Sequence, residues 1–141
     1  AKCRLSMAVP RGENYTGVTE GQRTAAKLLA HPGYELVIGH HPHVAQEVEI
    51  IDGMPVLYSL GNLVFGTPGR FEGGEGYGLV ARTLFGPNKA FEIRLSCIVT
   101  DNDQVAFQPD TCAPAEAEGL FSRLGPHLRV EGDVAVVETS G

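Results

Sequence analysis

Short runs of apolar residues, separated by glycine, proline and asparagine, divide the chain into predicted strands and helices. Strands are predicted at residues 4–9, 34–38, 48–51, 54–58, 78–85, 90–100 and 104–108, and helices at 20–30 and 115–124. Residues 134–137 are apolar as well, and form either a last strand or a frayed end. This mixture of elements in a chain of 141 residues predicts one domain of the mixed α/β class.

The first half of the chain has the pattern of a strand–helix–strand unit. Thr19 and Gln22 stand three positions apart where the first predicted helix begins, which is the spacing of a capping box. Ala25, Leu28 and Leu29 form the predicted apolar face of that helix. Because the helix connects two short apolar strands, we expect the strands to be parallel and the crossover to be right-handed.

Antiparallel hairpins are predicted for the rest of the chain. Asp52 and Gly53 separate two apolar arms and predict a type I′ turn. Pro55 lies in the second arm and needs an edge or bulge position, because proline has no backbone N–H group. Residues 66–78 contain many glycines, which predicts a mobile surface loop, and residues 86–88 and 101–103 predict turns. The inward-facing side chains are expected to be Phe91, Ile93, Leu95 and Cys97 in one strand and Leu120, Phe121 and Leu124 in the second helix.

Charge and cysteine content exclude several classes of protein. The formal net charge is −6 and no run of lysine and arginine is present, which argues against a nucleic-acid interface. Cys3, Cys97 and Cys112 are widely spaced and odd in number, so we expect buried thiols rather than a disulfide framework. No stretch approaches the roughly 20 apolar residues of a membrane span. The chain starts without methionine, close to a predicted strand, so we expect a piece of a longer protein whose localisation stays open.

The strongest chemical signal is the sequence GHHPH at residues 39–43, directly after a predicted buried strand. Ligands gather where strands end in open α/β sheets, and a sharp turn there can bring imidazoles together. We therefore predict His41 and His43 as ligands of a divalent metal, such as Mn, Fe or Zn, with His40 as a third donor. The remaining ligands must come from elsewhere in the protein. The alternative is a turn whose histidines are solvated or bond to the backbone.

Residues 35–65 resemble the bacterial capsule-synthesis proteins of the CapA type, a family linked to poly-γ-glutamate. The family's blocks are a GHHPH turn, a glutamate in a strand, and a YSLGN segment followed by phenylalanine. Residues 39–43, Glu49, residues 58–62 and Phe65 occupy these places. The resemblance covers the C-terminal half of the family's domain, and it implies part of a calcineurin-like metallophosphatase fold, an α/β/β/α sandwich with metal ligands on loops at strand ends.

The chain departs from the family pattern near its start. The family's N-terminal metal-ligand blocks are not present, and Pro10 stands where the family usually has a histidine ligand. Proline has no donor atom for a metal, so either Glu13 or a water substitutes for that histidine, or the site is weakened or lost.

The resemblance implies a metal-dependent hydrolase or transferase acting on a phosphoester or on a γ-glutamyl bond of an anionic polymer. His41 and His43 would hold one or two metals, and His40 would be a further ligand or a proton donor to the leaving group. Asn62 would orient a ligand or bind substrate, or would simply fix a turn through its side chain. Glu49 is expected to be an ordinary strand residue.

Two other functions stay open from the sequence. The chain could keep the fold without the chemistry and serve as an accessory protein of a membrane-associated, cell-surface polymer synthesis or export complex, which the proline at position 10 favours. It could also be an isolated half-domain that self-associates through an exposed sheet edge. The family is often membrane-anchored or extracytoplasmic, and this sequence contains no anchor.

Overall fold

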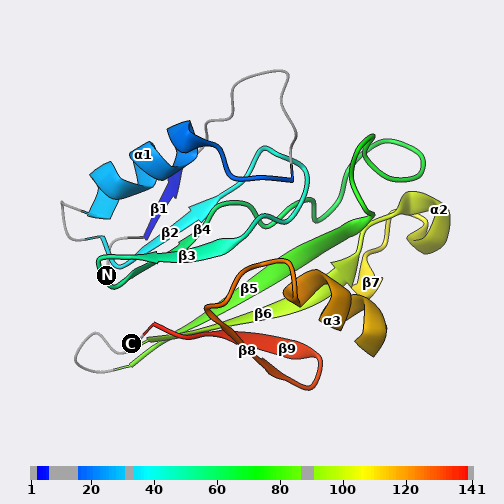
Figure 1. The fold of residues 1–141 in the computed structure, drawn as a ribbon. Coiled ribbons are helices and arrows are strands. Elements are labelled where there is room, and N and C mark those ends of the chain that lie inside the picture. The colour runs from blue at the N-terminus through cyan, green and yellow to red at the C-terminus, as the bar shows by residue number, and fades with distance from the viewer. Residues whose placement is uncertain (1–2, 7–15, 31–33, 87–90, 140–141) are drawn as a thin grey trace.

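Two β-sheets and three helices make up the chain in a computed structural model that describes residues 3–6, 16–30, 34–86 and 91–139 (Figure 1). A four-stranded sheet has the order β1-β2-β4-β3, and a second sheet has the order β5-β6-β9-β8 with the short β7 paired to β6. The mixed α/β class predicted from the sequence is confirmed. None of the described helices is long and apolar enough to cross a membrane.

The first sheet contains the predicted strand–helix–strand unit. β1 (Cys3–Ser6) pairs in parallel with β2 (Leu36–Gly39), and α1 (Glu20–Ala30) connects them. The capping box is confirmed, because the Thr19 backbone N–H donates to Oε1 of Gln22 at 2.9 Å and the Gln22 N–H donates to Oγ1 of Thr19 at 3.2 Å. β2 also pairs in parallel with β4 (Met54–Leu57).

The apolar face of α1 differs in part from the predicted one. Ala26 is the buried residue of the helix, and it packs against Val37, Val56 and Tyr58 of the sheet. Leu28 is 66% exposed, so its predicted inward position is wrong. The rotation of the helix is set by its polar contacts to the sheet as well as by its apolar residues, and the sequence pattern does not contain those contacts.

The hairpin of β3 (Val48–Ile51) and β4 has the predicted turn, since Asp52 and Gly53 both have positive φ angles, 49° and 78°. The predicted edge or bulge position of Pro55 is wrong, because β4 lies between β2 and β3. Pro55 is tolerated there because the pairing of β2 with β4 includes only Val56 and Leu57. No ladder hydrogen bond to β2 is therefore required of the proline nitrogen.

The second sheet is antiparallel. It consists of β5 (Tyr77–Phe85), β6 (Phe91–Val99), β9 (Val134–Val137) and β8 (Leu128–Glu131), with β7 (Asp110–Thr111) at the end of β6. The predicted alternation in β6 is confirmed, because Ile93, Leu95 and Cys97 are each at most 3% exposed. Residues 134–137 form a strand, which pairs on one side with β6 and on the other with β8, a strand that the sequence did not predict.

The strand predicted at residues 104–108 is wrong. These residues begin in the short helix α2 (Asn102–Val105), whose N-terminus is capped by Asp101 through a 3.0 Å hydrogen bond from the Asp103 N–H group to Oδ1. Phe107, which falls within the predicted strand, is 50% exposed and has a φ of 62°. The capping aspartate outweighs the weak apolar alternation of this segment.

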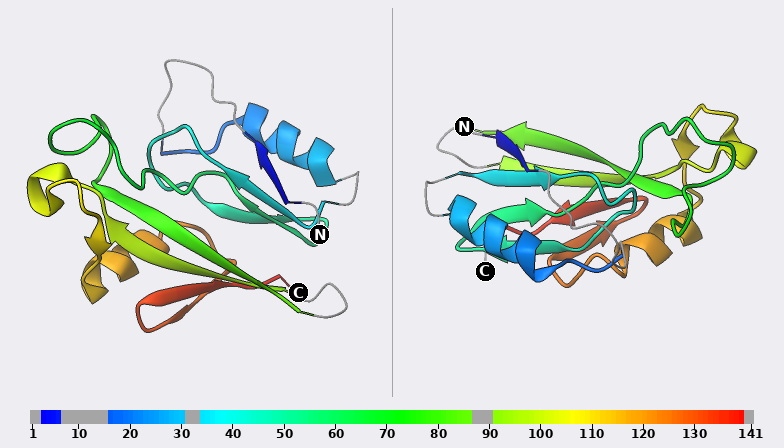
Figure 2. Two further views of the ribbon diagram at one scale, coloured as in Figure 1. Left: turned by 180° about the vertical axis from the view of Figure 1, so that it is seen from behind. Right: turned by 90° about the horizontal axis from the view of Figure 1, so that it is seen from above.

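The main core lies between the two sheets (Figures 1 and 2). Leu36, Val48 and Leu57 of the first sheet share one buried cluster with Leu79, Ile93, Leu95, Ala135 and Val137 of the second. The helix α3 (Pro114–Phe121), shorter than the predicted 115–124, adds Leu120 and Phe121 to this cluster, and Leu124 follows, all three buried as predicted. Because α1 covers the opposite face of the first sheet, the layers are helix, sheet, sheet.

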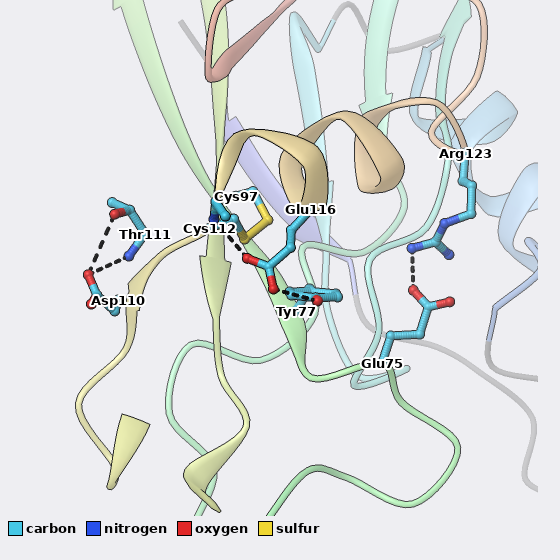
Figure 3. Close-up of a disulfide and its surroundings, with 9 residues drawn as sticks. Glu75, Tyr77, Cys97, Asp110, Thr111, Cys112, Glu116 and Arg123 are labelled. Carbon is cyan, nitrogen blue, oxygen red and sulfur yellow. Dashed lines mark hydrogen bonds and ion pairs between the residues drawn. A yellow bond between two sulfur atoms is a disulfide. The ribbon is translucent and has the colours of Figure 1, made fainter. Parts of the chain in front are cut away.

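Cys97 and Cys112 form a disulfide, so the prediction of buried free thiols is wrong for this pair (Figure 3). β7 returns beside the end of β6, and the Cys112 N–H group donates to the Cys97 carbonyl oxygen at 3.2 Å. This pairing brings the two Cα atoms to 5.4 Å, within the range that a disulfide spans. The register of β7 against β6 decides the contact, and sequence spacing does not reveal it.

Candidate functional site

The histidine turn, residues 39–43, follows the carboxyl end of β2 and packs on the end of β4. A Cβ atom at Gly39 would lie 2.1 Å from the Tyr58 carbonyl oxygen, so only glycine is compatible with this approach. Pro42 is fully buried, whereas His41 and His43 have left-handed φ angles of 105° and 62°. Strained backbone at non-glycine residues is typical of functional sites and is maintained here by the surrounding packing.

His43 is held on three sides. Its Nδ1 lies 2.9 Å from Oδ1 of Asn62. The ring stacks on Phe71, with centroids 4.2 Å apart and planes inclined by 21°, and contacts Phe65 edge-on at 4.7 Å. Both the position and the plane of this imidazole are therefore defined by neighbouring side chains, as catalytic and metal-binding sites require.

The three clustered histidines do not all face one point. The rings of His41 and His43 are 6.2 Å apart, and His41 is exposed. His40 instead lines a pocket beneath α1, together with Gln22, Leu29 and Tyr58. Within the described residues, no group of three or more histidine, cysteine, aspartate or glutamate side chains is arranged to hold a metal ion. The turn therefore offers a pair of imidazoles rather than a triad, and the metal prediction stays a prediction.

Asn62 is positioned by close backbone contacts on both sides. Gly61, with a φ of 74°, lies against the backbone of residues 44 and 45. A Cβ atom at Gly78 would meet the Asn62 carbonyl oxygen at 2.1 Å, so the start of β5 passes directly over this residue. These contacts aim the Asn62 amide at His43, and two residues that the sequence singled out separately lie side by side.

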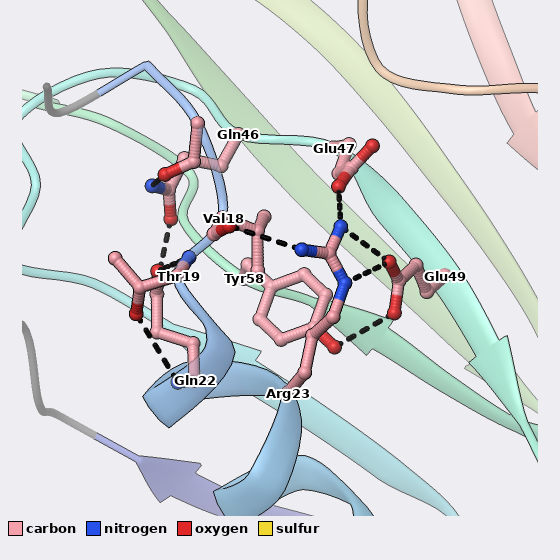
Figure 4. A network of polar contacts seen from close by, with 9 residues as sticks. Val18, Thr19, Gln22, Arg23, Gln46, Glu47, Glu49 and Tyr58 are labelled. Carbon is pink, nitrogen blue, oxygen red and sulfur yellow. Dashed lines mark hydrogen bonds and ion pairs between the residues drawn. The ribbon is translucent and has the colours of Figure 1, made fainter.

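A second group of polar side chains joins α1 to β3 and β4 (Figure 4). Arg23 Nε donates to Oε1 of Glu49 at 2.7 Å, and Nη2 pairs with Glu47. The Tyr58 hydroxyl donates to Oε2 of the same Glu49 at 2.8 Å. Arg23 also donates from Nη1 to the Val18 carbonyl oxygen at 3.0 Å. Glu49 thus connects Arg23 to Tyr58 within a polar network, and the expectation of an ordinary strand residue is wrong.

The charges in this network change the titration of its members. Burial, followed by the hydrogen bond to Glu49, raises the pKa of the Tyr58 hydroxyl well above its ordinary value of 10. The hydrogen bond to Glu49 also raises the pKa of the Arg23 guanidinium. At neutral pH the tyrosine of this network is therefore neutral and the guanidinium is charged. Such a network fixes α1 against the strands that carry the histidine turn.

Gln22 extends the network toward residues that the sequence did not single out. Its Nε2 donates to Oε1 of Gln46 at 2.8 Å, and Gln46 in turn donates from its own Nε2 to the Gly17 carbonyl oxygen at 2.9 Å. Gln46 is only 2% exposed, so this chain of amides is part of the protein interior. Pro10 and Glu13, which the sequence placed at a possible metal-ligand position, lie outside the described residues.

The comparison with known proteins concerns the segment that carries the histidine turn. Residues 7–67 match the family described as bacterial capsule synthesis protein PGA_cap. The chain is 43% identical over 44 residues to the PGA biosynthesis protein CapA of Bacillus subtilis (strain 168), covering 31% of this chain and 12% of that protein. It is 38% identical over 55 residues to the capsule biosynthesis protein CapA of Bacillus anthracis, covering 38% of this chain and 13% of that protein. The matches span about an eighth of each relative.

Proposed function

We propose that this chain, which belongs through residues 7–67 to the bacterial capsule synthesis protein family, contributes a metal-dependent, phosphoesterase-like hydrolase site to poly-γ-glutamate capsule biosynthesis. The single observation that carries the proposal is the environment of His43. Its imidazole is oriented by Asn62, Phe65 and Phe71 at the carboxyl end of a parallel strand. Ligand sites of α/β proteins gather at this position.

His41 and His43 can supply two of the ligands that a divalent metal needs. Oδ1 of Asn62 can only accept a hydrogen bond, so Nδ1 of His43 is the donor, and in the neutral imidazole Nε2 then keeps its lone pair. A histidine whose other nitrogen is fixed in this way is the usual form of a metal ligand. His43 and His41 would hold the metal, Mn, Fe or Zn, and further ligands would come from the rest of the protein. The metal, when bound, would activate water and polarise the substrate oxygen.

His40 has a different place in the proposed site. It lines the pocket under α1 with Gln22 and Tyr58. We propose that His40 is a proton donor to the leaving group, and not that it completes the pair formed by His41 and His43. The substrate class would be a phosphoester or an anionic polymer such as poly-γ-glutamate.

The arrangement of layers supports a finer assignment of the fold. Two facing sheets with α1 on one outer side are expected for part of the α/β/β/α sandwich of calcineurin-like metallophosphatases. We propose that this chain is the C-terminal half of such a domain. β5, a nine-residue strand at the edge of the second sheet, would then be a site of self-association when the other half is absent. Sedimentation at increasing concentration tests this, and a monomer throughout would contradict it.

The metal content of the purified chain, measured by plasma mass spectrometry after incubation with Mn, Fe or Zn, tests the proposed site. Near-stoichiometric metal is expected in the wild type and a strong loss in the H41A/H43A variant. The matched control is His127→Ala, because His127 precedes β8 and has its backbone carbonyl paired with Glu138, away from the turn. Equal metal content in all three proteins, or none in any, would contradict a metal site at the turn.

A second candidate is an accessory protein of a cell-surface polymer synthesis complex, with the fold kept and the catalysis lost. Pro10 in place of the family histidine favours it, and so does the absence of a three-ligand cluster within the described residues. Hydrolysis of a generic phosphodiester and of a γ-glutamyl peptide separates the two functions. Turnover that depends on His43 supports the hydrolase, whereas metal binding without turnover supports the accessory protein.

A further inference from the structure

The loop that carries the two phenylalanines around His43 is fastened by a residue from a distant part of the chain. Asn102 is 8% exposed, and its Nδ2 donates to the carbonyl oxygens of Phe65 and Thr67 at 2.6 Å each. Its backbone N–H donates to the Gly69 carbonyl oxygen at 2.8 Å. One buried asparagine therefore binds three carbonyl groups in five consecutive loop residues.

Asn102 is itself fixed in place by its neighbours in the chain. Asp101 caps the helix α2 that Asn102 begins, and the preceding Thr100 donates its N–H to the Gly76 carbonyl oxygen at 2.7 Å. The loop is thus held both in its first half and at its last residue before β5. Residues 66–76 contain no helix or strand of their own, so these contacts replace the backbone hydrogen bonds that regular structure would supply.

The rings on this loop determine the plane of the His43 imidazole. Asn62 fixes a single atom, Nδ1, and an imidazole can rotate about one hydrogen bond. The stacked Phe71 and the edge-on Phe65, whose own rings are 5.7 Å apart and nearly perpendicular, remove that freedom. If the loop were released, the His43 backbone would stay in place, but its ring could rotate and Nε2 would no longer point in one direction.

We propose that Asn102 is a positioning residue for His43, acting through the loop of residues 65–71. Its effect on metal affinity rests on the proposed role of His43 as a ligand, whereas its effect on the His43 ring does not. The amide donor is the essential group, since three carbonyl oxygens face Asn102 and an acceptor in its place would repel the two that its side chain binds.

The test is the substitution Asn102→Asp, which keeps the shape of the side chain and replaces its donor by a carboxylate. We expect the ring-proton signals of His43 in NMR spectra to leave the upfield position caused by the stacked Phe71 and to approach those of Phe71→Leu. Zn²⁺ affinity, measured by calorimetry, should fall about tenfold or more, the usual effect of losing an outer partner of a ligand. Methyl signals of Ile93 and Leu95 in the core should not move.

The matched control is Gln108→Glu, the same amide-to-acid change on an exposed side chain of the same segment, which should leave His43 and Zn²⁺ binding unchanged. Wild-type His43 signals in Asn102→Asp would overturn the proposal. If that variant does not fold, hydrogen exchange of the Asn102 side-chain amide in the wild type tests the proposal instead. We expect this amide to be protected, and exchange at the rate of free asparagine would overturn the proposal. A wild type that binds no Zn²⁺ contradicts the proposed function while the ring signals still test Asn102.

Discussion

Oδ1 of Asn62 lies 2.9 Å from Nδ1 of His43, although the two residues are 19 positions apart in the chain. Asn62 follows β4 and His43 follows β2, and these two strands are neighbours in the first sheet. Parallel strands end at the same edge of a sheet, so the residues that follow them meet there. The contact selects one imidazole tautomer and leaves Nε2 free to accept a proton or bind a metal.

Replacing Asn62 with leucine removes the acceptor while keeping the size of the side chain. Because Nδ1 then loses its partner, both tautomers of His43 become populated and fewer molecules present a lone pair at Nε2. We expect the affinity for Zn²⁺ to fall by about 10- to 100-fold. Calorimetry measures the affinity, and two-bond ¹H–¹⁵N correlation spectra of the imidazole measure the tautomer.

The matched control for Asn62→Leu is Gln108→Leu, an amide-to-aliphatic change at an exposed position. It should leave both the affinity and the tautomer as they are in the wild type. An Asn62→Leu protein with unchanged affinity and a single His43 tautomer would show that Asn62 only fixes its own turn.

The network around Glu49 predicts a loss of stability at alkaline pH. The pKa of Tyr58 is raised in the folded protein by burial and by Glu49, so the folded state holds its proton at a pH where the unfolded chain releases it. The stabilisation is therefore complete below the unfolded pKa of about 10 and decreases as the pH rises above it. Each such group lowers the free energy of unfolding by at most about 1.4 kcal/mol per pH unit.

Urea unfolding between pH 8 and pH 11 measures this effect (the pH range is about one to two units on each side of the tyrosine pKa). Tyr58→Phe should be less stable than the wild type at pH 8 by about 1.5 kcal/mol, because it loses the hydrogen bond to a carboxylate, and its stability should decline less above pH 10. Some decline in the free energy of unfolding should remain in that variant, because the pKa of Tyr77 is also raised, by its hydrogen bond to Glu116. Identical pH dependence in both proteins would contradict the network's role.

The features that the sequence predicts correctly are those decided by near neighbours. The capping box at Thr19 and Gln22, the type I′ turn at Asp52 and Gly53, and the alternation in β6 each depend on residues within a few positions. The strand that precedes the histidine turn is also predicted correctly, because a short apolar run bounded by glycines is a local signature; the roles of the histidines and of Asn62 stay predictions.

The features that the sequence does not predict depend on contacts between distant segments. The Cys97–Cys112 disulfide follows from the register of β7, and the interior position of Pro55 follows from the short pairing of β2 with β4. Residues 101–103 predicted a turn, and nothing local indicates that the Asn102 amide binds a loop 35 and 37 residues earlier in the chain. The separation of His40 from the other two histidines is likewise decided by packing against α1.

The disulfide should contribute measurably to stability. It closes a segment with a sequence separation of 15 residues, which includes the turn through α2 and β7. A closed loop of this size is expected to stabilise the fold by about 3 kcal/mol, chiefly by restricting the unfolded chain. Unfolding of C97S/C112S in urea should show this loss, whereas Cys3→Ser leaves the pair intact and should have a smaller effect. Equal stability of the wild type and the double variant would contradict the bond.

Gly39 should be the least tolerant position of the histidine turn. A Cβ atom there would lie 2.1 Å from the Tyr58 carbonyl oxygen, and that oxygen belongs to backbone at the end of β4, which has no flexible side chain to yield. The Gly39 carbonyl also accepts the Leu60 N–H at 3.3 Å, so separating the two segments would cost a hydrogen bond as well.

Gly39→Ala should therefore lose about 3 kcal/mol or more of the free energy of unfolding, the range of strained core substitutions, and His43 should lose its wild-type ring signals at the same time. The control is Gly66→Ala, where a Cβ atom would meet nothing within 4 Å. That variant should be as stable as the wild type to within about 0.5 kcal/mol. A Gly39→Ala protein as stable as Gly66→Ala would mean that β2 and β4 do not approach as closely as described, and the position of the histidine turn on β4 would have to be revised.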